Sequence, residues 1–115
     1  MNSNIIGQKG EDIALEYLIK KGYDFIEKNY KVYSGEIDLI FRDGTYLVFV
    51  EVKYRKNIKF GYPRDFVTTK KQRKIISAAE SFIEEKELYN MQPRFDVVEI
   101  IEQTGVIEHL VNAFP

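Results

Sequence analysis

Two strongly apolar segments separated by a tight turn constrain the fold of this chain more than any other feature. Residues 35–41 read Gly-Glu-Ile-Asp-Leu-Ile-Phe, residues 46–54 read Tyr-Leu-Val-Phe-Val-Glu-Val-Lys-Tyr, and Arg-Asp-Gly-Thr lies between them. Branched and aromatic residues on both sides of an Asp-Gly pair are typical of a β-hairpin. The sequence therefore predicts two neighbouring antiparallel strands.

Asp38 lies on the first of these strands, and Glu51 and Lys53 lie on the second. A two-residue turn at residues 43–44 would place Asp38 opposite Phe49. Glu51 would then be the diagonal neighbour of Asp38 on the same face, at roughly 7–8 Å between backbones. Lys53 shares that face because side chains alternate along a strand. A register shifted by one residue would separate the two carboxylates, so the prediction depends on the pairing.

Paired carboxylates beside an ammonium group suit the hydrolysis of a phosphodiester. Carboxylate oxygens are ligands for hard divalent cations, which neutralise phosphate charge and activate water. Lys53 would orient the attacking water or stabilise charge on the phosphoryl oxygens. The alternative interpretation is an ordinary ion pair on the wet face of a hairpin. However, residues 46–52 are apolar on both faces, and charges at the end of a buried strand need a cation or a partner.

The composition indicates one globular domain over residues 1–115, because 44% of the residues are hydrophobic and 14% aromatic. The chain has no cysteine, which excludes disulfides and thiolate metal sites and suits a reducing compartment. It has neither a signal peptide pattern nor an apolar segment of membrane-spanning length. These features predict a cytoplasmic protein that does not interact with membranes.

The formal net charge of −1 conceals a basic stretch over residues 53–74, with nine basic residues against one acid. A polyanionic substrate would lie on such a stretch beside the carboxylates. The alternative is a solvated loop and helix start. Aromatic residues at 54, 60, 62 and 66 would stack on bases or anchor the loop. The candidate nucleic-acid-binding residues are Arg55, Lys56, Lys70, Lys71, Gln72 and Lys74.

The rest of the sequence predicts helices and further strands. Helical periodicity indicates a first helix over residues 4–21, with Glu11 on the flank of its apolar stripe, where it can lean toward the hairpin. A second helix begins at Thr69, where Thr69 and Gln72 match a capping box, although Gln72 could instead touch substrate. Strands are predicted over residues 23–33, 95–101 and 106–110. His109, the one histidine, is read as structural.

This order, one helix, three strands, a helix and two strands, resembles the PD-(D/E)XK nuclease superfamily. Asp38 matches its aspartate, Glu51-Val52-Lys53 its (D/E)XK element, and Glu11 the first-helix glutamate of archaeal Holliday junction resolvases. More closely, the chain is identified as a member of the YraN family of bacterial nuclease-like proteins. The residues that carry this resemblance are Gly10-Glu11, Ala14, Tyr17-Leu18, Gly22-Tyr23, Asn29-Tyr30, Gly35–Ile40, Val48–Lys53, Lys71-Gln72, Arg94–Val98 and Asn112–Phe114.

The resemblance implies an α/β (α+β) fold of the restriction-endonuclease type, a mixed sheet flanked by helices, with a Mg²⁺ or Mn²⁺ site. Asp38, Glu51 and the Val52 carbonyl would be ligands, with Glu11 bound directly or through water. Lys53 would orient water. Ile37 replaces the proline of the superfamily's name, but that proline takes no part in the chemistry. Glu36 would be a supporting ligand or the partner of Lys53.

Two functions follow from these expectations. The first is a metal-dependent endonuclease that cuts DNA, selective for branched or single-stranded DNA by analogy with the resolvases. The second is a nucleic-acid-binding or adaptor protein that uses a nuclease-like scaffold without catalysis. Cutting both strands of a junction requires two active sites, which a homodimer would supply.

Overall fold

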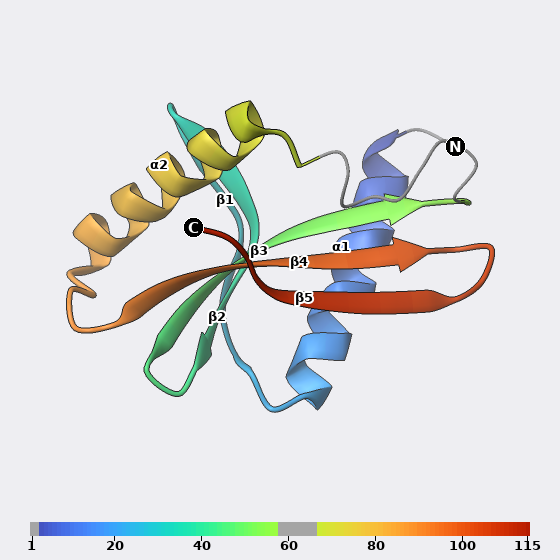
Figure 1. Cartoon of the computed structure of the whole chain (residues 1–115), viewed down its shortest axis with the longest axis horizontal. Helices are drawn as coiled ribbons and strands as arrows, with labels where there is room; N and C mark the ends of the chain where they lie inside the picture. Colours follow the sequence, from blue (N-terminus) through green and yellow to red (C-terminus); the bar gives the residue numbers. More distant parts are fainter. Residues whose placement is uncertain (1–2, 58–66) are drawn as a thin grey trace.

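The computed structural model describes residues 3–57 and 67–115, with side chains from residue 9 onward, and its centre is a five-stranded sheet (Figure 1). In chain order the elements are α1 (Ser3–Lys20), β1 (Asp24–Val32), β2 (Gly35–Asp43), β3 (Tyr46–Arg55), α2 (Thr69–Lys86), β4 (Gln92–Ile101) and β5 (Val106–Phe114). The predicted element order and the mixed α+β architecture are confirmed.

The strands lie side by side in the order in which they occur along the chain. β3 and β4 are parallel and every other neighbouring pair is antiparallel. Two parallel neighbours need a crossover connection, and α2 lies in it. The path from β3 through α2 to β4 therefore brings the second helix back across the sheet, above the strands that carry Asp38 and Glu51.

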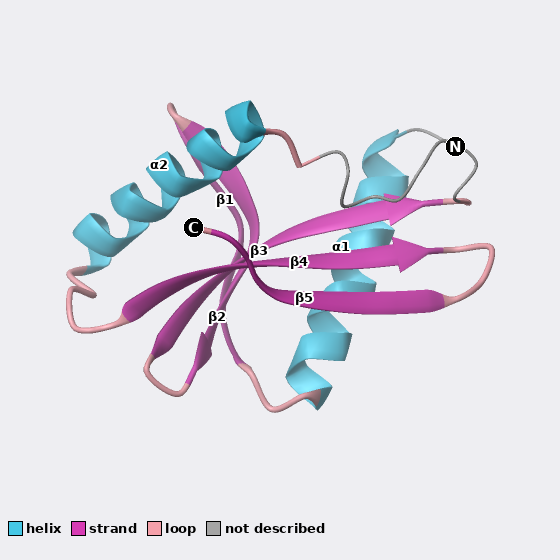
Figure 2. Cartoon of the chain, viewed as in Figure 1, coloured by secondary structure: helices cyan, strands magenta, loops and turns pink. Residues whose placement is uncertain are grey.

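The two helices cover opposite faces of the sheet (Figure 2). On one face, Ala14 and Leu18 of α1 pack against Leu39 and Val50. On the other, the apolar side of α2 packs against Phe49 and its neighbours. β4 is buried along eight consecutive residues because both of its faces are covered. Among the described residues, no helix is long and apolar enough to cross a membrane.

Several element ends differ from their predicted positions because strand pairing extends beyond the apolar runs. β4 begins at Gln92, which pairs with Tyr46, rather than at residue 95. β5 continues past residue 110 to Phe114, which pairs with Phe95. α2 is capped by Thr68 and not by Thr69, since the Thr68 hydroxyl accepts a hydrogen bond from the Lys71 N–H at 3.2 Å.

His109 belongs to a largely buried hydrogen-bonded network around Asp96, which agrees with its predicted structural role. Its Nε2 lies 2.7 Å from Asp96 Oδ2. Arg94 donates to both oxygens of Asp96, at 3.0 and 2.9 Å, and also to Asp43 and to the Tyr23 hydroxyl. Buried charges persist only when they are paired in this way. The network ties β4 and β5 to the β2–β3 hairpin, at the hairpin's turn.

Candidate functional site

Asp38 and Glu51 come together where the ladder between β2 and β3 opens. The last pairing of that ladder joins Leu39 to Val50. Beyond this pair, the Val52 N–H donates to Asp38 Oδ2 at 2.7 Å. The Asp38 side chain therefore accepts a hydrogen bond that a backbone carbonyl of β2 would accept in a regular ladder.

The register differs from the predicted one by two residues. Asp43 pairs with Tyr46, so the turn lies at residues 44–45 and not at 43–44, and Ile40, not Asp38, lies opposite Phe49. Gly44 has φ +61, a conformation that suits glycine in such a turn. A two-residue shift preserves the face, so it keeps Asp38 and Glu51 on the same side. The same register, continued past Leu39–Val50, would set them directly rather than diagonally opposite each other. Glu36 therefore does not lie opposite Glu51, where the predicted register would have placed it.

Glu51 is buried, with 5% of its surface exposed. Its Oε1 lies 3.4 Å from Lys53 Nζ and 3.5 Å from Lys71 Nζ. Lys53 follows on the same strand face, whereas Lys71 reaches down from the first turn of α2, which packs on that face. Two ammonium groups on one oxygen compensate the burial of the Glu51 charge.

Asp38 is partly buried, and its pKa lies well above that of a free carboxyl group. Burial and the neighbouring Glu51 carboxylate raise the pKa of Asp38 to about 8, although the Val52 N–H and Lys71 act in the opposite direction. Glu11 adds a smaller contribution that also raises this pKa. A carboxylate whose charge is opposed by burial and by like charges is a typical feature of a site built to bind a cation.

Glu11 approaches this pair from α1, the third element of the site. Burial, Glu36 and Asp12 raise the pKa of Glu11, and Glu51 also contributes, which places its carboxylate within electrostatic reach of the strand acids. A hydrogen bond with the Asn29 side chain lowers the pKa of Glu11 and so acts in the opposite sense. These contributions agree with an approach of Glu11 to the hairpin acids, and its part in metal binding stays a prediction.

Asn29 is a site residue that the sequence analysis missed. In the β1–β2 register it falls between the pairs Lys28–Leu39 and Tyr30–Ile37, level with Asp38. Its φ is +53, a left-handed conformation that asparagine adopts more readily than most residues. The left-handed backbone beside Asp38 and the hydrogen bond to Glu11 place Asn29 next to both acids. Asn29-Tyr30 stood out in the sequence, but nothing there indicated the contact with Glu11.

The donors of the site suit a hard divalent cation in kind. Asp38, Glu51 and Glu11 offer carboxylate oxygens, which Mg²⁺ and Mn²⁺ prefer. The Val52 carbonyl faces the Asp38 side as well, because the N–H and C=O of one strand residue point to the same neighbour. Among the described residues, no three acidic or histidine side chains gather closely enough to hold a metal ion. Metal binding by this set therefore stays a prediction.

The predicted nucleic-acid-binding residues separate into groups. Lys71 and Lys74 line one pocket beside Glu36, together with Lys31 of β1, which sequence reasoning also missed. Lys70 is exposed on the first turn of α2. Lys31 joins this pocket because the β1–β2 hairpin packs beside α2, and local sequence patterns do not predict that packing.

Gln72, Arg55 and Lys56 lie elsewhere. The Gln72 amide donates to the Val67 carbonyl at 3.1 Å, so it closes the start of α2, close to the predicted capping role. The Arg55 and Lys56 carbonyls each accept a hydrogen bond from the β4–β5 turn, at 2.8 Å. The predicted aromatic residues at 60, 62 and 66, with Lys59 and Arg64, lie outside the described residues.

The sequence matches the model of the Uncharacterised protein family UPF0102 over residues 10–100, which include every predicted site residue. A UPF0102 protein of Clostridioides difficile (strain 630) is 46% identical to this chain, over 99% of this chain and 100% of that protein. A UPF0102 protein of Carboxydothermus hydrogenoformans is 44% identical over 97% of each chain. One of Dictyoglomus turgidum is 44% identical, over 99% of this chain and 100% of that protein.

Proposed function

The chain belongs to UPF0102, the YraN family, and we propose that it is a divalent-metal-dependent endonuclease that hydrolyses phosphodiester bonds in DNA. The observation that carries this proposal is the closeness of Asp38 and Glu51 at the opening of the β2–β3 ladder. Burial and the Glu51 charge raise the pKa of Asp38 to about 8, while Lys53 and Lys71 contact Glu51. Perturbed acids beside fixed cations are characteristic of catalytic sites.

Each residue has a role that follows from its contacts. Asp38, Glu51 and the Val52 carbonyl would hold Mg²⁺ or Mn²⁺, with Glu11 bound directly or through water, and the ion would supply positive charge to the phosphate and acidify water. The Val52 N–H fixes Asp38 Oδ2 and leaves the other oxygen for binding. Lys53 donates hydrogen bonds to the attacking water or to charge that develops on the phosphoryl oxygens.

The resemblance to archaeal Holliday junction resolvases supports branched DNA as the substrate class, with single-stranded DNA as the second candidate. A resolvase must cut two strands, and two copies of this chain would supply the two sites. The basic residues beside the carboxylates support a polyanionic substrate, because cations that neutralise phosphates dominate the affinity for nucleic acids.

A nucleic-acid-binding or adaptor protein without turnover is the second candidate. This candidate is favoured by the two ammonium groups near Glu51 Oε1, since a carboxylate neutralised by lysines can have a purely structural role. The two candidates differ in a single measurable property, which is cleavage that depends on a divalent cation.

The test is a panel of labelled linear, flapped, four-way and single-stranded DNA substrates, incubated with Mg²⁺, Mn²⁺ or a chelator. We expect cleavage of at least one substrate with metal and none with chelator. Asp38→Asn and Glu51→Gln should each reduce cleavage by about 100-fold or more, because losing a ligand costs more than the 10–100-fold typical of groups that merely orient ligands. DNA binding should stay equal or become tighter, since a negative charge is removed.

Glu84→Gln is the matched control, because Glu84 is exposed near the far end of α2. It should retain the parent's cleavage rate. A parent protein that cuts none of the substrates with either metal, or site variants that cut as fast as the parent, would contradict the endonuclease proposal and favour the adaptor.

A further inference from the structure

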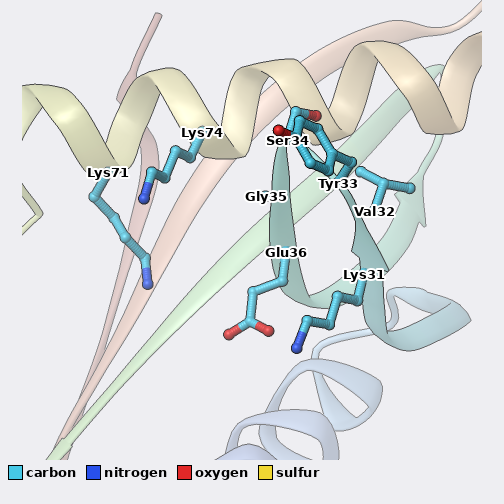
Figure 3. Close-up of a pocket in the computed structure, with 8 residues that line it drawn as sticks. All are labelled: Lys31, Val32, Tyr33, Ser34, Gly35, Glu36, Lys71 and Lys74. Atoms are coloured by element: carbon cyan, nitrogen blue, oxygen red, sulfur yellow. The ribbon is translucent and has the colours of Figure 1, made fainter.

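A lysine-lined pocket lies beside the carboxylates, between the β1–β2 turn and the N-terminal turns of α2 (Figure 3). In Figure 3, Lys71 and Lys74 extend from the helix, and Lys31 and Glu36 extend from the hairpin toward the same space. The pocket has a volume of about 310 Å³, which lies at the lower end of the range for small-ligand sites.

The walls of this pocket are fixed by direct backbone contact. A Cβ at Gly35 would collide with the Lys74 carbonyl, so the helix backbone lies directly on the start of β2. Across the hairpin, Lys31 pairs with Glu36 and Val32 pairs with Gly35. The fold therefore places three lysines from two elements around one space.

The charge of the pocket selects an anion. Lys31, Lys71 and Lys74 face a single carboxylate, Glu36, so the lining is positive on balance. A phosphate group matches this lining in both charge and hydrogen-bonding capacity.

Lys71 connects the pocket to the carboxylate pair. It lines the pocket and its Nζ lies 3.5 Å from Glu51 Oε1. A strand that presents one phosphate to Asp38 and Glu51 would thus bring a neighbouring phosphate to the three lysines. Lys71 can contact Glu51 in the free protein and phosphate in the complex, because its side chain is flexible.

We propose that this pocket is a phosphate-binding subsite for a nucleic-acid strand, next to the phosphate at the carboxylates, with Lys31 and Lys74 as its anchoring cations. The inference rests on the proposed function for the position of the strand. It adds a hairpin residue, Lys31, to the binding surface and fixes the path of the strand over the β1–β2 turn.

The test measures binding of a labelled single strand of about 20 nucleotides in chelator, by fluorescence anisotropy over about 50–300 mM salt. Lys31→Ala with Lys74→Ala should weaken binding at least about tenfold and make the salt dependence shallower by about one unit of slope. Lys28→Ala with Arg73→Ala removes the same charge from the same two elements, at exposed positions outside the pocket. The control pair should change affinity by no more than about twofold and leave the slope unchanged.

Equal effects of the pocket pair and the control pair would overturn the inference, because the loss of affinity would then follow from the removed charge and not from its position in the pocket. If the pocket variants bind DNA more weakly than the control pair but the parent cuts no substrate, the subsite is supported and the endonuclease proposal is contradicted. If the parent cuts DNA but the pocket variants bind like the control pair, the endonuclease proposal stands and the subsite is contradicted.

A comparison of strands with a 5′-phosphate and a 5′-hydroxyl identifies the source of the phosphate. Tighter binding of the 5′-phosphorylated strand, lost in the pocket variants, assigns the subsite to a terminal phosphate. Equal binding of both strands, weakened alike in the pocket variants, assigns it to an internal phosphate. Inorganic phosphate added at constant ionic strength should shift the amide NMR signals of Ser34 and Gly35, which line the pocket. Unchanged signals at these residues would contradict the proposal.

Discussion

Asp38 combines two roles that oppose each other in the folded chain. Its Oδ2 accepts the Val52 N–H and so completes the hydrogen bonding at the opening of the β2–β3 ladder. Its charge is disfavoured there, because burial and Glu51 raise its pKa to about 8. Such a residue costs stability, and under the proposed function it would provide a metal ligand, a combination that is common where function and stability conflict.

The raised pKa of Asp38 predicts how stability changes with pH. Below about pH 4 the carboxyl is protonated in both the folded and the unfolded chain. Between about pH 4 and pH 8 the folded chain retains a proton that the unfolded chain has lost, so the free energy of unfolding falls as pH rises toward the pKa of about 8. Asp38→Asn keeps an oxygen that can accept the Val52 N–H, but it cannot ionise. The free energy of unfolding of this variant should therefore not fall in this way as pH rises.

Urea unfolding near pH 5, 7 and 9 measures the effect. We expect Asp38→Asn to gain about 1 kcal/mol or more over the parent between the first and the last pH, a value below full linkage because the side chain is partly exposed. Asp24→Asn, at an exposed position at the start of β1, serves as control. Parallel pH profiles of parent and Asp38→Asn would show that this carboxylate is not destabilised by ionisation.

At the scale of elements, the position of α2 decides whether Lys71 reaches Glu51. The helix lies on the sheet through its buried stripe of Ile75, Ala78, Ala79 and Phe82. It approaches β2 so closely that Gly35 has no room for a side chain. This contact places the first turn of the helix over the open end of the ladder, where Lys71 meets the Glu51 carboxylate.

Gly35→Ala should therefore disturb the site as well as the packing. Its Cβ would collide with the Lys74 carbonyl, and relief requires a backbone shift of α2 that costs about 1–3 kcal/mol. Because the shift moves Lys71, we expect metal-dependent cleavage to fall about tenfold or more at a temperature where the variant is fully folded. Urea unfolding and the DNA cleavage assay measure the two effects.

Gly44→Ala separates the loss of stability from the loss of position. Gly44 has φ +61, and a Cβ added there would meet no neighbouring atom within 4 Å, so alanine costs about 1–2 kcal/mol through the backbone alone. The Gly44→Ala variant should cleave DNA like the parent. If Gly35→Ala, once folded, also cleaves like the parent, the placement of α2 does not matter to the chemistry.

Local patterns predicted the elements but not all of their registers and caps. Helical periodicity identified α1 and α2, and composition with turn residues identified the five strands of the described residues. The hairpin turn was assigned one residue too early, since Asp-Gly can occupy more than one position of a turn and only the pairing partners decide. Thr68 and Thr69 are likewise equivalent in sequence, and the geometry of the chain entering α2 selects Thr68 as the cap.

At the scale of the whole molecule, the fold converts separated residues into one site. Glu11 comes from α1, Asp38 from β2, Glu51 and Lys53 from β3, and Lys71 from α2. The two helices cover opposite faces of the sheet, yet both deliver a charged side chain to the open end of the β2–β3 ladder. The carboxylates on adjacent strands were predictable from the hairpin, because pairing relates them directly.

The contributions of Lys31, Lys71 and Asn29 depend on how the helices pack on the sheet. Lys71 stood out as a basic residue, but its contact with Glu51 follows from the crossover between β3 and β4. Asn29 contributes through a left-handed backbone at one position of β1. Such placements arise from tertiary packing, which no short-range pattern in the sequence records.

Joint binding of a divalent cation by Asp38 and Glu51 can be seen in a crystal soaked in Mn²⁺ and measured near the manganese absorption edge. We expect one strong anomalous peak in contact with carboxylate oxygens of both residues, absent from crystals of Glu51→Gln. A map with no peak between them, or with manganese only at exposed acids such as Glu84 and Glu85, would contradict it.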